Sequence, residues 1–277
     1  MTVCEKAYAK INLHLDVLGR YNNGFHDILS VMESVSLCDT LEISVSEYDT
    51  LVVAISCNDH NLPLDNSNLI GISAIKYLSK FGIKANVDVK LNKLIPIGAG
   101  LGGGSSDAAA TLRALNKIYG LASEEELLQM AAEIGSDVSF CLVGGRALCT
   151  GRGEKVEAVP NYPISHYVIA IGEGRVSTPV AFRALDEKYN FFVDGARSVI
   201  HPQILHYNIF ENVIHSDEID KIKKILMSNG AEYSLMSGSG PSVFGEFTDE
   251  QQARETVDNL KRQGFSAYYC HTIRGEL

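Results

Sequence analysis

The sequence predicts an α+β protein built from two domains. A chain of 277 residues is long enough for two modest domains or a single large one. The composition changes around residues 160–165, where two prolines stand within four residues. After this point the expected order of strands and helices is β-α-α-β-β-α-β, which is typical of a ferredoxin-like sandwich with one helical element extended. We therefore expect one domain over residues 1–160 and a second over residues 161–277.

The first domain is expected to begin with strands. Residues 6–18 alternate between apolar and polar side chains, as in a strand with one buried face. Lys10 and Asn12 lie on the polar face, where the ordinary expectation is exposure to solvent. An Asn-Gly pair at 23–24 favours a tight turn. Further strands are expected at 31–35, 39–45, 51–56 and 85–91.

Three helices are expected in the same domain, at 69–81, after the glycine-rich loop as far as 119, and at 123–134. Asn68 stands at the start of the first and is a candidate cap. Gly120 is placed to end the second, and Ser123 with Glu126 forms a capping box for the third. Residues 140–150 and 156–159 are expected to be strand and turn.

The second domain is expected to contain seven regular elements. Strands are expected at 167–171, 233–236, 242–247 and 267–272, and helices at 179–186, 217–229 and 249–263. Between two of these strands lies Ser-Gly-Ser-Gly-Pro-Ser, residues 237–242. This loop is either a plain hairpin connection or a second contact for an anion or substrate, and its five serines and glycines favour a contact.

A glycine-rich loop in the first domain, Pro96 to Asp107, is the main candidate site. It reads P-I-G-A-G-L-G-G-G-S-S-D and leads into an alanine-rich helix. Glycine lets a ligand approach the main chain, and a helix N-terminus offers free N–H groups to an anion. We interpret the loop as a site for the triphosphate of a nucleotide. Two simpler interpretations stay open at this point: a flexible connector, or a loop in which Ser105 or Ser106 only caps the helix.

Three familiar nucleotide motifs do not account for this loop. A Walker A sequence needs a Gly-Lys-Ser/Thr ending, and the loop has no lysine. Gly98, Gly100 and Gly103 satisfy G-x-G-x-x-G, but the acidic residues about twenty positions on begin a helix and do not end a strand. The chain also lacks the H-R-D and D-F-G triplets of protein kinases.

Composition excludes several classes of protein. A formal net charge of −10 argues against a nucleic-acid surface. The apolar runs are too short to span a bilayer, and the first residues do not form a secretory signal. The six cysteines never form C-x-x-C, which argues against a zinc site or disulfide framework and for a reducing cytosol. We expect a cytoplasmic protein without nucleic-acid or membrane partners, as a monomer or a homodimer.

Three motifs together resemble those of the GHMP kinases, a superfamily of ATP-dependent small-molecule kinases. They are A-K-I-N-L at 9–13, P-I-G-A-G-L-G-G-G-S-S-D-A-A at 96–109 and M-S-G-S-G-P-S-V-F at 236–244. The resemblance covers the chain end to end and implies the GHMP kinase fold. That fold combines an N-terminal domain like domain 2 of ribosomal protein S5 with a ferredoxin-like C-terminal domain.

Other segments resemble one group of these kinases. Four segments are similar to sequences in kinases of the non-mevalonate isoprenoid pathway. They are G-F-H at 24–26, the tripled glycine with S-S-D at 102–107, I-G-S-D-V-S-F at 134–140 and V-S-T-P-V-A-F at 176–182. The resemblance implies ATP as co-substrate, Mg²⁺, and 4-diphosphocytidyl-2-C-methyl-D-erythritol as the alcohol. Another alcohol of the mevalonate or homoserine type, and a silent nucleotide-binding homologue, are the alternatives.

The resemblance also implies roles for individual residues. Asp137 would be the general base, although on its own it reads more simply as a helix cap, and Lys10 would stabilise its charge. Phe25 would stack on the pyrimidine, His26 would read its edge, and Ser106 would lie near Mg²⁺. The implied ATP-binding residues are Pro96, Gly98, Ala99, Gly100, Leu101, Gly102, Gly103, Gly104, Ser105, Ser106, Asn68 and Lys93. The implied substrate-binding residues are Asn12, Phe25, His26, Phe182, Gly238, Ser239 and Gly240.

The chain departs from the pattern at four places. Phe25 replaces the usual tyrosine and so lacks a hydroxyl, and Ala99 replaces a frequent glycine. Ile209 stands where an aspartate is usual, and residues 172–174 replace a proline-containing turn. None of these changes touches Lys10 or Asp137, so we expect activity.

Overall fold

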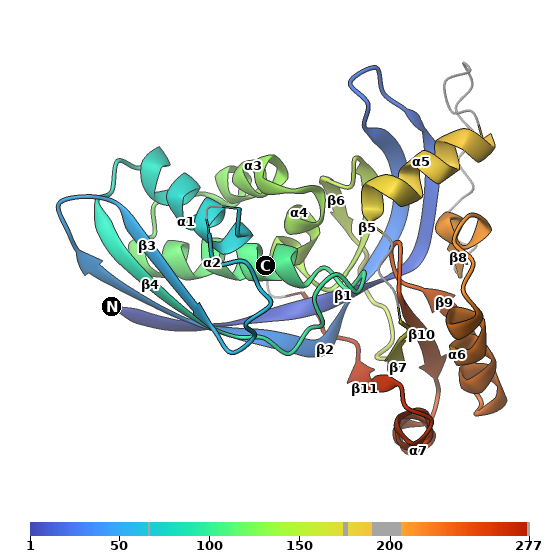
Figure 1. Cartoon of the computed structure of the whole chain (residues 1–277). Coiled ribbons are helices and arrows are strands. Elements are labelled where there is room, and N and C mark those ends of the chain that lie inside the picture. The colour runs from blue at the N-terminus through green and yellow to red at the C-terminus, as the bar shows by residue number, and fades with distance from the viewer. Residues whose placement is uncertain (66, 174–176, 190–205, 276–277) are drawn as a thin grey trace.

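The computed structural model describes residues 1–65, 67–173, 177–189 and 206–275, and contains two β-sheets with helices packed against each (Figure 1). The first part of the chain supplies β1 (Thr2–Arg20), β2 (His26–Glu47), β3 (Val52–Cys57), α1 (Leu69–Lys80), β4 (Ala85–Asn92), α2 (Gly103–Tyr119), α3 (Glu124–Ile134), α4 (Ser136–Val143), β5 (Arg146–Gly151) and β6 (Lys155–Ala158). The second part supplies β7 (His166–Ile171), α5 (Thr178–Tyr189), β8 (Tyr207–Asn208), the 3₁₀ helix η1 (Ile209–Asn212), α6 (Asp217–Ser228), β9 (Tyr233–Met236), β10 (Ser242–Phe247), α7 (Glu250–Arg262) and β11 (Ser266–His271).

The larger sheet is organised around the antiparallel pair β1 and β2. Its strand order is β3-β4-β2-β1-β8, with β5 added to β2 and β6 to β5, and helices α1 to α4 cover one face (Figure 1). The two strands expected at 31–35 and 39–45 are in fact one continuous strand. Its alternation is interrupted by a bulge, because Tyr8 pairs with Cys38 whereas Ala9 pairs with Val35.

The core above this sheet follows from the composition of α2. Ala108, Ala109 and Ala110 are fully buried together with Leu112 and Leu115. Small side chains let the helix lie close to β1 and β2, and the larger side chains of α1 and β4 complete the cluster. The capping box expected at Ser123 is formed, so the start of α3 is fixed as the sequence predicts.

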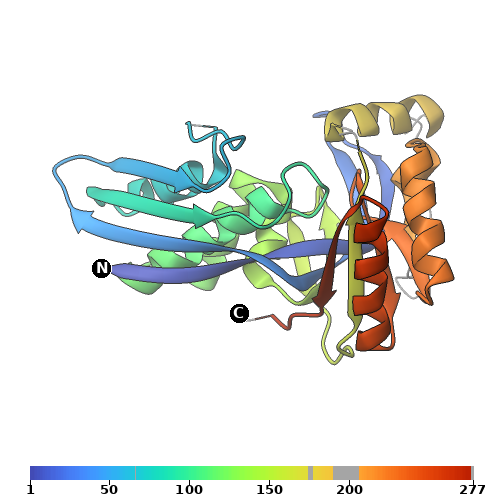
Figure 2. The same ribbon diagram turned by 60° about the horizontal axis from the view of Figure 1, so that its bottom comes forward.

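The smaller sheet confirms the ferredoxin-like prediction for the second half. Its strand order is β11-β7-β10-β9 and every neighbouring pair is antiparallel. Helices α6 and α7 pack against the sheet, and Figure 2 shows α7 running alongside its strands. Strand β8 and helix η1 were not expected, and β8 joins the larger sheet by pairing with β1.

Other sequence predictions need correction or stay open. Phe140 lies in helix α4 and not in a strand, because the segment 136–143 continues as a helix until Gly144, and β5 begins only at Arg146. Val176 and Gly174, which belong to two of the quoted segments, lie outside the described residues. The division of the chain near residue 160 stays a prediction. In the described part of the chain, no helix is long and apolar enough to cross a membrane.

Candidate functional site

A cavity of about 900 Å³ lies where the two halves of the chain meet. Its walls come from β1, the β1–β2 turn, the glycine-rich loop, the start of α4, the β5–β6 turn, α5 and the β9–β10 loop. Ten of the residues predicted from the sequence line it: Lys10, Asn12, Phe25, His26, Gly100, Gly102, Asp137, Phe182, Gly238 and Ser239. Residues far apart in sequence are thus brought to one place.

The predicted catalytic pair is within ion-pair distance in this cavity. Lys10 Nζ lies 3.6 Å from Asp137 Oδ2. The side chain of Lys10 is 5% exposed and that of Asp137 33% exposed, so the carboxylate opens towards the cavity and the ammonium lies behind it. Asp137 also occupies the first turn of α4, where the helix dipole favours a negative charge. Asp137 is therefore held as an accessible carboxylate beside a buried cation.

Asn12 connects this pair to the second half of the chain. Its Oδ1 accepts hydrogen bonds from Lys10 Nζ at 2.7 Å and from the backbone N–H of Gly238 at 3.0 Å. Its Nδ2 donates to Ser30 Oγ at 2.9 Å, and Ser30 in turn donates to the carbonyl of His14. Lys10 and Asn12 are both buried, so the simple expectation of solvent exposure for this strand face was wrong.

The glycine-rich loop passes between β1 and the β9–β10 loop. The backbone N–H of Lys10 donates to the carbonyl of Leu101 at 2.9 Å, and Ser237 Oγ donates to the carbonyl of Gly100 at 3.0 Å. A Cβ at Gly102 would lie 2.8 Å from Cγ of Lys10, and one at Gly100 would lie 2.2 Å from the carbonyl oxygen of Ser237. Both glycines have positive φ, so this close packing requires residues without a side chain.

The remaining residues of the loop divide between other environments. Pro96, Gly98 and Ala99 line a second cavity of about 450 Å³, with Tyr268 and Pro241 opposite. Leu101 is buried in the core. Gly103, Gly104 and Ser105 form the first turn of α2, whose start has no side-chain cap, and such a turn offers N–H groups to an anion.

Lys93 is one of the predicted ATP-binding residues, and its contact with the nucleotide stays a prediction. It is buried beneath the start of α2 and donates hydrogen bonds to Asp107 Oδ2, at 2.7 Å, and to Asp39 Oδ2. Asp39 also accepts the backbone N–H groups of Leu94 and Ile95. The group therefore fixes the strand end that leads into the loop. Asp39 was missed because no motif contains it, and only the packing of β2 on α2 brings it there.

The titration of this buried group follows from its charges. Burial raises the pKa of Asp107 to about 7, with Asp39 adding to the rise and Lys93 opposing it. Burial also acts to lower the pKa of Lys93, but its two carboxylate partners outweigh that effect, so its pKa is raised. One ammonium therefore faces two carboxyl groups, and the second carboxyl group takes up a proton more readily than usual.

Ser106 and Asn68 have local roles in the structure. Ser106 is 1% exposed, and its hydroxyl donates to the carbonyl of Gly103 at 2.9 Å. Asn68 is the cap of α1, as the sequence predicted, with its side chain accepting the N–H of Ile70 at 3.0 Å. A Cβ at Gly104 would lie 3.9 Å from Leu69, so this cap lies close to the loop.

The far end of the cavity contains the predicted pyrimidine site. The ring of Phe182, on α5, stacks on that of His26 with centroids 4.3 Å apart. Asp186, one helical turn further on, approaches His26 Nε2 at 2.7 Å and accepts a hydrogen bond from Arg20 at 2.9 Å. Phe25 is half exposed and lies under the guanidinium of Arg152, 4.8 Å from its ring centroid. In Figure 1, α5 lies beside the β1–β2 hairpin that carries His26.

The β9–β10 loop completes the cavity with two of its three predicted residues. Gly238 contacts Asn12, and Ser239 Oγ lies 3.2 Å from Thr178 Oγ1 at the start of α5. Gly240 does not line the cavity, because a Cβ there would point at Met236. Sequence reasoning missed four other cavity residues, which belong to no recognisable motif: Arg20, Arg152, Arg183 and Asp186.

Comparison with known proteins agrees with this geometry. Profiles described as the GHMP kinases N terminal domain and GHMP kinases C terminal match residues 68–145 and 203–266. The 4-diphosphocytidyl-2-C-methyl-D-erythritol kinase of Caldicellulosiruptor saccharolyticus is 41% identical over 268 residues, covering 92% of each chain. A crystal structure of 4-(cytidine 5'-diphospho)-2C-methyl-D-erythritol kinase superposes with a TM-score of 0.80 at 30% identity, covering 98% of this chain and 99% of that one.

A more distant structure shares the fold alone. The mevalonate kinase of Methanococcus jannaschii matches with a TM-score of 0.73 over 99% of both chains, at 13% identity. The two profiles, the long match at 41% identity and the cavity with its glycine-rich loop all point the same way. The chain belongs to the GHMP kinases, which implies ATP as its co-substrate, and within them to the family of 4-diphosphocytidyl-2-C-methyl-D-erythritol kinases.

Proposed function

We propose that this protein transfers the γ-phosphoryl group of ATP to the 2-hydroxyl of 4-diphosphocytidyl-2-C-methyl-D-erythritol. The observation that carries the proposal is the pair Lys10 and Asp137, which lies in one cavity with the glycine-rich loop on one side and the His26 site on the other. A phosphate site, a base and a site for a planar ring are what this transfer needs. The names of the relatives support the same substrate.

The proposed mechanism uses few groups. Asp137 takes the proton of the 2-hydroxyl as that oxygen forms a bond to the γ-phosphorus, and the bond to the bridging oxygen of ADP breaks with its electron pair leaving on ADP. Lys10 keeps Asp137 ionised and stabilises negative charge on the transferring group. Asn12 holds the ammonium in place through its hydrogen bond at 2.7 Å. Positioning and neutralisation of charge account for most of the catalysis in such reactions.

We propose that Mg²⁺ enters with the nucleotide. The described residues contain no cluster of three or more His, Cys, Asp or Glu side chains suited to a metal. Ser106, the predicted ligand, is buried and donates to Gly103, so it does not fit an exposed ligand position. Mg²⁺ commonly keeps several waters and binds through nucleotide phosphates, and it would supply neutralisation of phosphate charge here. We assign Ser106 the role of holding the first turn of α2.

Two other functions remain as alternatives. Another GHMP kinase reaction, on an alcohol of the mevalonate or homoserine type, would need no site for a planar ring. Phe25 and the stacked rings of His26 and Phe182 favour an aromatic substrate instead. A silent nucleotide-binding homologue would need neither a base nor its cation, which argues against that alternative.

The test measures the ADP that the protein forms from ATP in the presence of Mg²⁺ and 4-diphosphocytidyl-2-C-methyl-D-erythritol, here called the cytidyl alcohol. Mevalonate and homoserine are offered as alternative substrates. We expect turnover with the cytidyl alcohol only, and a kcat lowered by at least about 100-fold in the Asp137→Asn variant. A higher kcat/KM with one of the other alcohols would show that this alcohol, and not the cytidyl alcohol, is the substrate. An ATP-binding protein without turnover on any alcohol would favour the silent homologue.

We also propose the cellular context. The reaction would be a step in the formation of isoprenoid precursors by the non-mevalonate route. All six cysteines are free thiols in the structure, which supports a reducing compartment such as the cytoplasm. The thiol content of the purified native protein tests this location, and the presence of disulfides would contradict it.

A further inference from the structure

Four strongly basic side chains line the large cavity, and they differ in their partners. Lys10 pairs with Asp137, and Arg20 pairs with Asp186. Arg152 and Arg183 line the same cavity. Within the described part of the chain, the guanidinium groups of Arg152 and Arg183 donate no hydrogen bond. The carboxylate nearest to the Arg152 guanidinium is that of Glu154, whose Oε2 lies 4.0 Å from Arg152 Nε. A protein with a net charge of −10 therefore keeps two arginines available at its proposed site.

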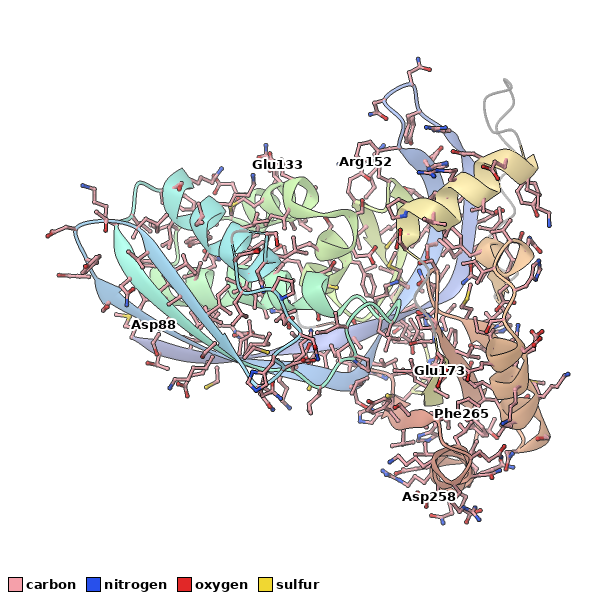
Figure 3. All side chains as sticks on the ribbon, in the orientation of Figure 1. Asp88, Glu133, Arg152, Glu173, Asp258 and Phe265 are labelled. Carbon is pink, nitrogen blue, oxygen red and sulfur yellow. The ribbon has the colours of Figure 1, made fainter. Side chains whose placement is uncertain are left out.

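Arg152 is placed between the two ends of the cavity. It lies in the turn between β5 and β6, where Glu154 accepts the backbone N–H of Arg152 at 2.6 Å. A Cβ at the next residue, Gly153, would lie 3.4 Å from Ser136, the neighbour of Asp137. The guanidinium itself stacks over Phe25. Arg152 thus lies close to the proposed base on one side and to the proposed pyrimidine site on the other. Figure 3 labels Arg152 on the side of the molecule where α5 faces the helices of the first half.

Arg183 comes from the second half of the chain. It follows Phe182 on α5, whose ring stacks on His26, and its side chain is exposed. It therefore brings a second cation to the cavity from α5. Arginine is suited to such a site because its planar fork of N–H donors matches the oxygens of a phosphate in a bidentate manner.

We infer that Arg152 and Arg183 bind the diphosphate of the alcohol substrate. The inference rests on the proposed function, because in that substrate a diphosphate joins the pyrimidine nucleoside to the alcohol that is phosphorylated. With the nucleoside at His26 and the hydroxyl at Asp137, the diphosphate lies between them, where Arg152 is found. The two arginines then determine specificity for a substrate that carries a diphosphate in this position, and neither one touches the transferring phosphoryl group.

The test combines removal of the arginine with removal of the phosphates from the ligand. Inhibition constants of cytidine and CDP are measured against the cytidyl alcohol for wild type, Arg152→Ala, Arg183→Ala and Arg152→Lys. We expect Arg152→Ala to raise the inhibition constant of CDP by roughly 10- to 100-fold, as loss of a charge-assisted hydrogen bond does. The inhibition constant of cytidine is expected to stay unchanged. Arg183→Ala is expected to act in the same direction. Arg152→Lys keeps the charge without the fork and is expected to lie between wild type and Arg152→Ala.

A matched control is available on α7, outside the cavity. Arg254 stacks over Tyr269 at 3.9 Å, as Arg152 does over Phe25, but lies outside the cavity, so Arg254→Ala is expected to change neither constant. If Arg152→Ala weakened the binding of cytidine and of CDP equally, Arg152 would only support the ring of Phe25, and the inference would be overturned. Unchanged CDP binding would also overturn it. Both results are distinct from failure of the proposed function, in which the wild type itself shows no turnover of the cytidyl alcohol.

Discussion

Replacing Gly100 by alanine should separate the glycine-rich loop from the β9–β10 loop. The added Cβ would lie 2.2 Å from the carbonyl oxygen of Ser237, whereas ordinary contacts begin at 3.4 Å, so one main chain must move by about 1.2 Å. That movement strains the hydrogen bond from Gly238 to Asn12 and, through Asn12, the position of Lys10. A displacement of about 1 Å near reacting groups lowers rates by about 100-fold, and we expect kcat to fall by that factor.

The backbone strain of the same substitution can be measured separately. Gly100 has a φ of +78°, and Gly120, at the end of α2, has a φ of +67° with open space where a Cβ would lie, since no atom is within 4 Å. Gly120→Ala should therefore cost only the left-handed conformation, about 1–2 kcal/mol of the free energy of unfolding. Gly100→Ala should cost about 1–3 kcal/mol more because of the collision. Urea unfolding and steady-state kinetics of both variants test this. If Gly100→Ala kept a kcat close to that of Gly120→Ala, contact between the two loops would not control the site.

Three further predictions address single residues. Asp137→Asn should lower kcat by about 100- to 10,000-fold with an unchanged melting temperature. A variant with a near-normal kcat would show that Asp137 is not the general base. Lys10→Ala should lower kcat by at least about 100-fold with little change in ATP affinity by titration, whereas a loss confined to ATP affinity would make Lys10 a nucleotide contact. The pKa of Asp107 is raised from 3.8 to about 7, so its stabilising contribution is complete below the lower value and is lost as pH rises through the higher one. Wild type should therefore lose unfolding free energy between about pH 4 and pH 7 relative to Asp107→Asn. If the unfolding free energies of the two proteins, measured in urea, changed in parallel over this range, the prediction would be contradicted.

The sequence predicted those parts of the site that depend on local pattern. Alternation along β1 placed Lys10 and Asn12 on one face, and the glycine run located the loop that precedes α2. It did not predict that this face of β1 is buried, since burial comes from the β9–β10 loop and α4, which pack over it from later in the chain. The carboxylate partners of Lys93 were missed for the same reason, because they come from β2 and α2.

The parts that sequence reasoning missed are set by tertiary contacts. Arg152 lies in an ordinary turn and Asp186 in the middle of a helix with no motif around it. Each lies at the cavity beside the β1–β2 hairpin, which comes between α5 and the β5–β6 turn. The bulge at residues 36–37 shifted the alternation of β2 and made one strand look like two, since an irregularity in the pairing changes the face on which later side chains lie.

The position of Lys10 in the middle of β1 explains why the site lies where three hydrophobic cores meet. Along β1, Ala7 packs in the core of the larger sheet, Ile11 in the core against the smaller sheet, and Val17 in the core beneath α5 and α6. One strand therefore couples all three cores and carries Lys10, the proposed catalytic lysine, where they meet.

A buried polar cluster stabilises the same junction. Glu33 on β2 binds Arg146 on β5, and it accepts hydrogen bonds from Tyr167 on β7 at 3.1 Å and from Thr272 after β11 at 2.6 Å. Burial raises the pKa of Glu33, and Arg146 opposes the rise. A satisfied buried network of this kind favours one arrangement of the two sheets over others. Adjustment to substrate is therefore expected to come from the loops at 96–102 and 237–242 and from α5, and not from rotation of one sheet against the other.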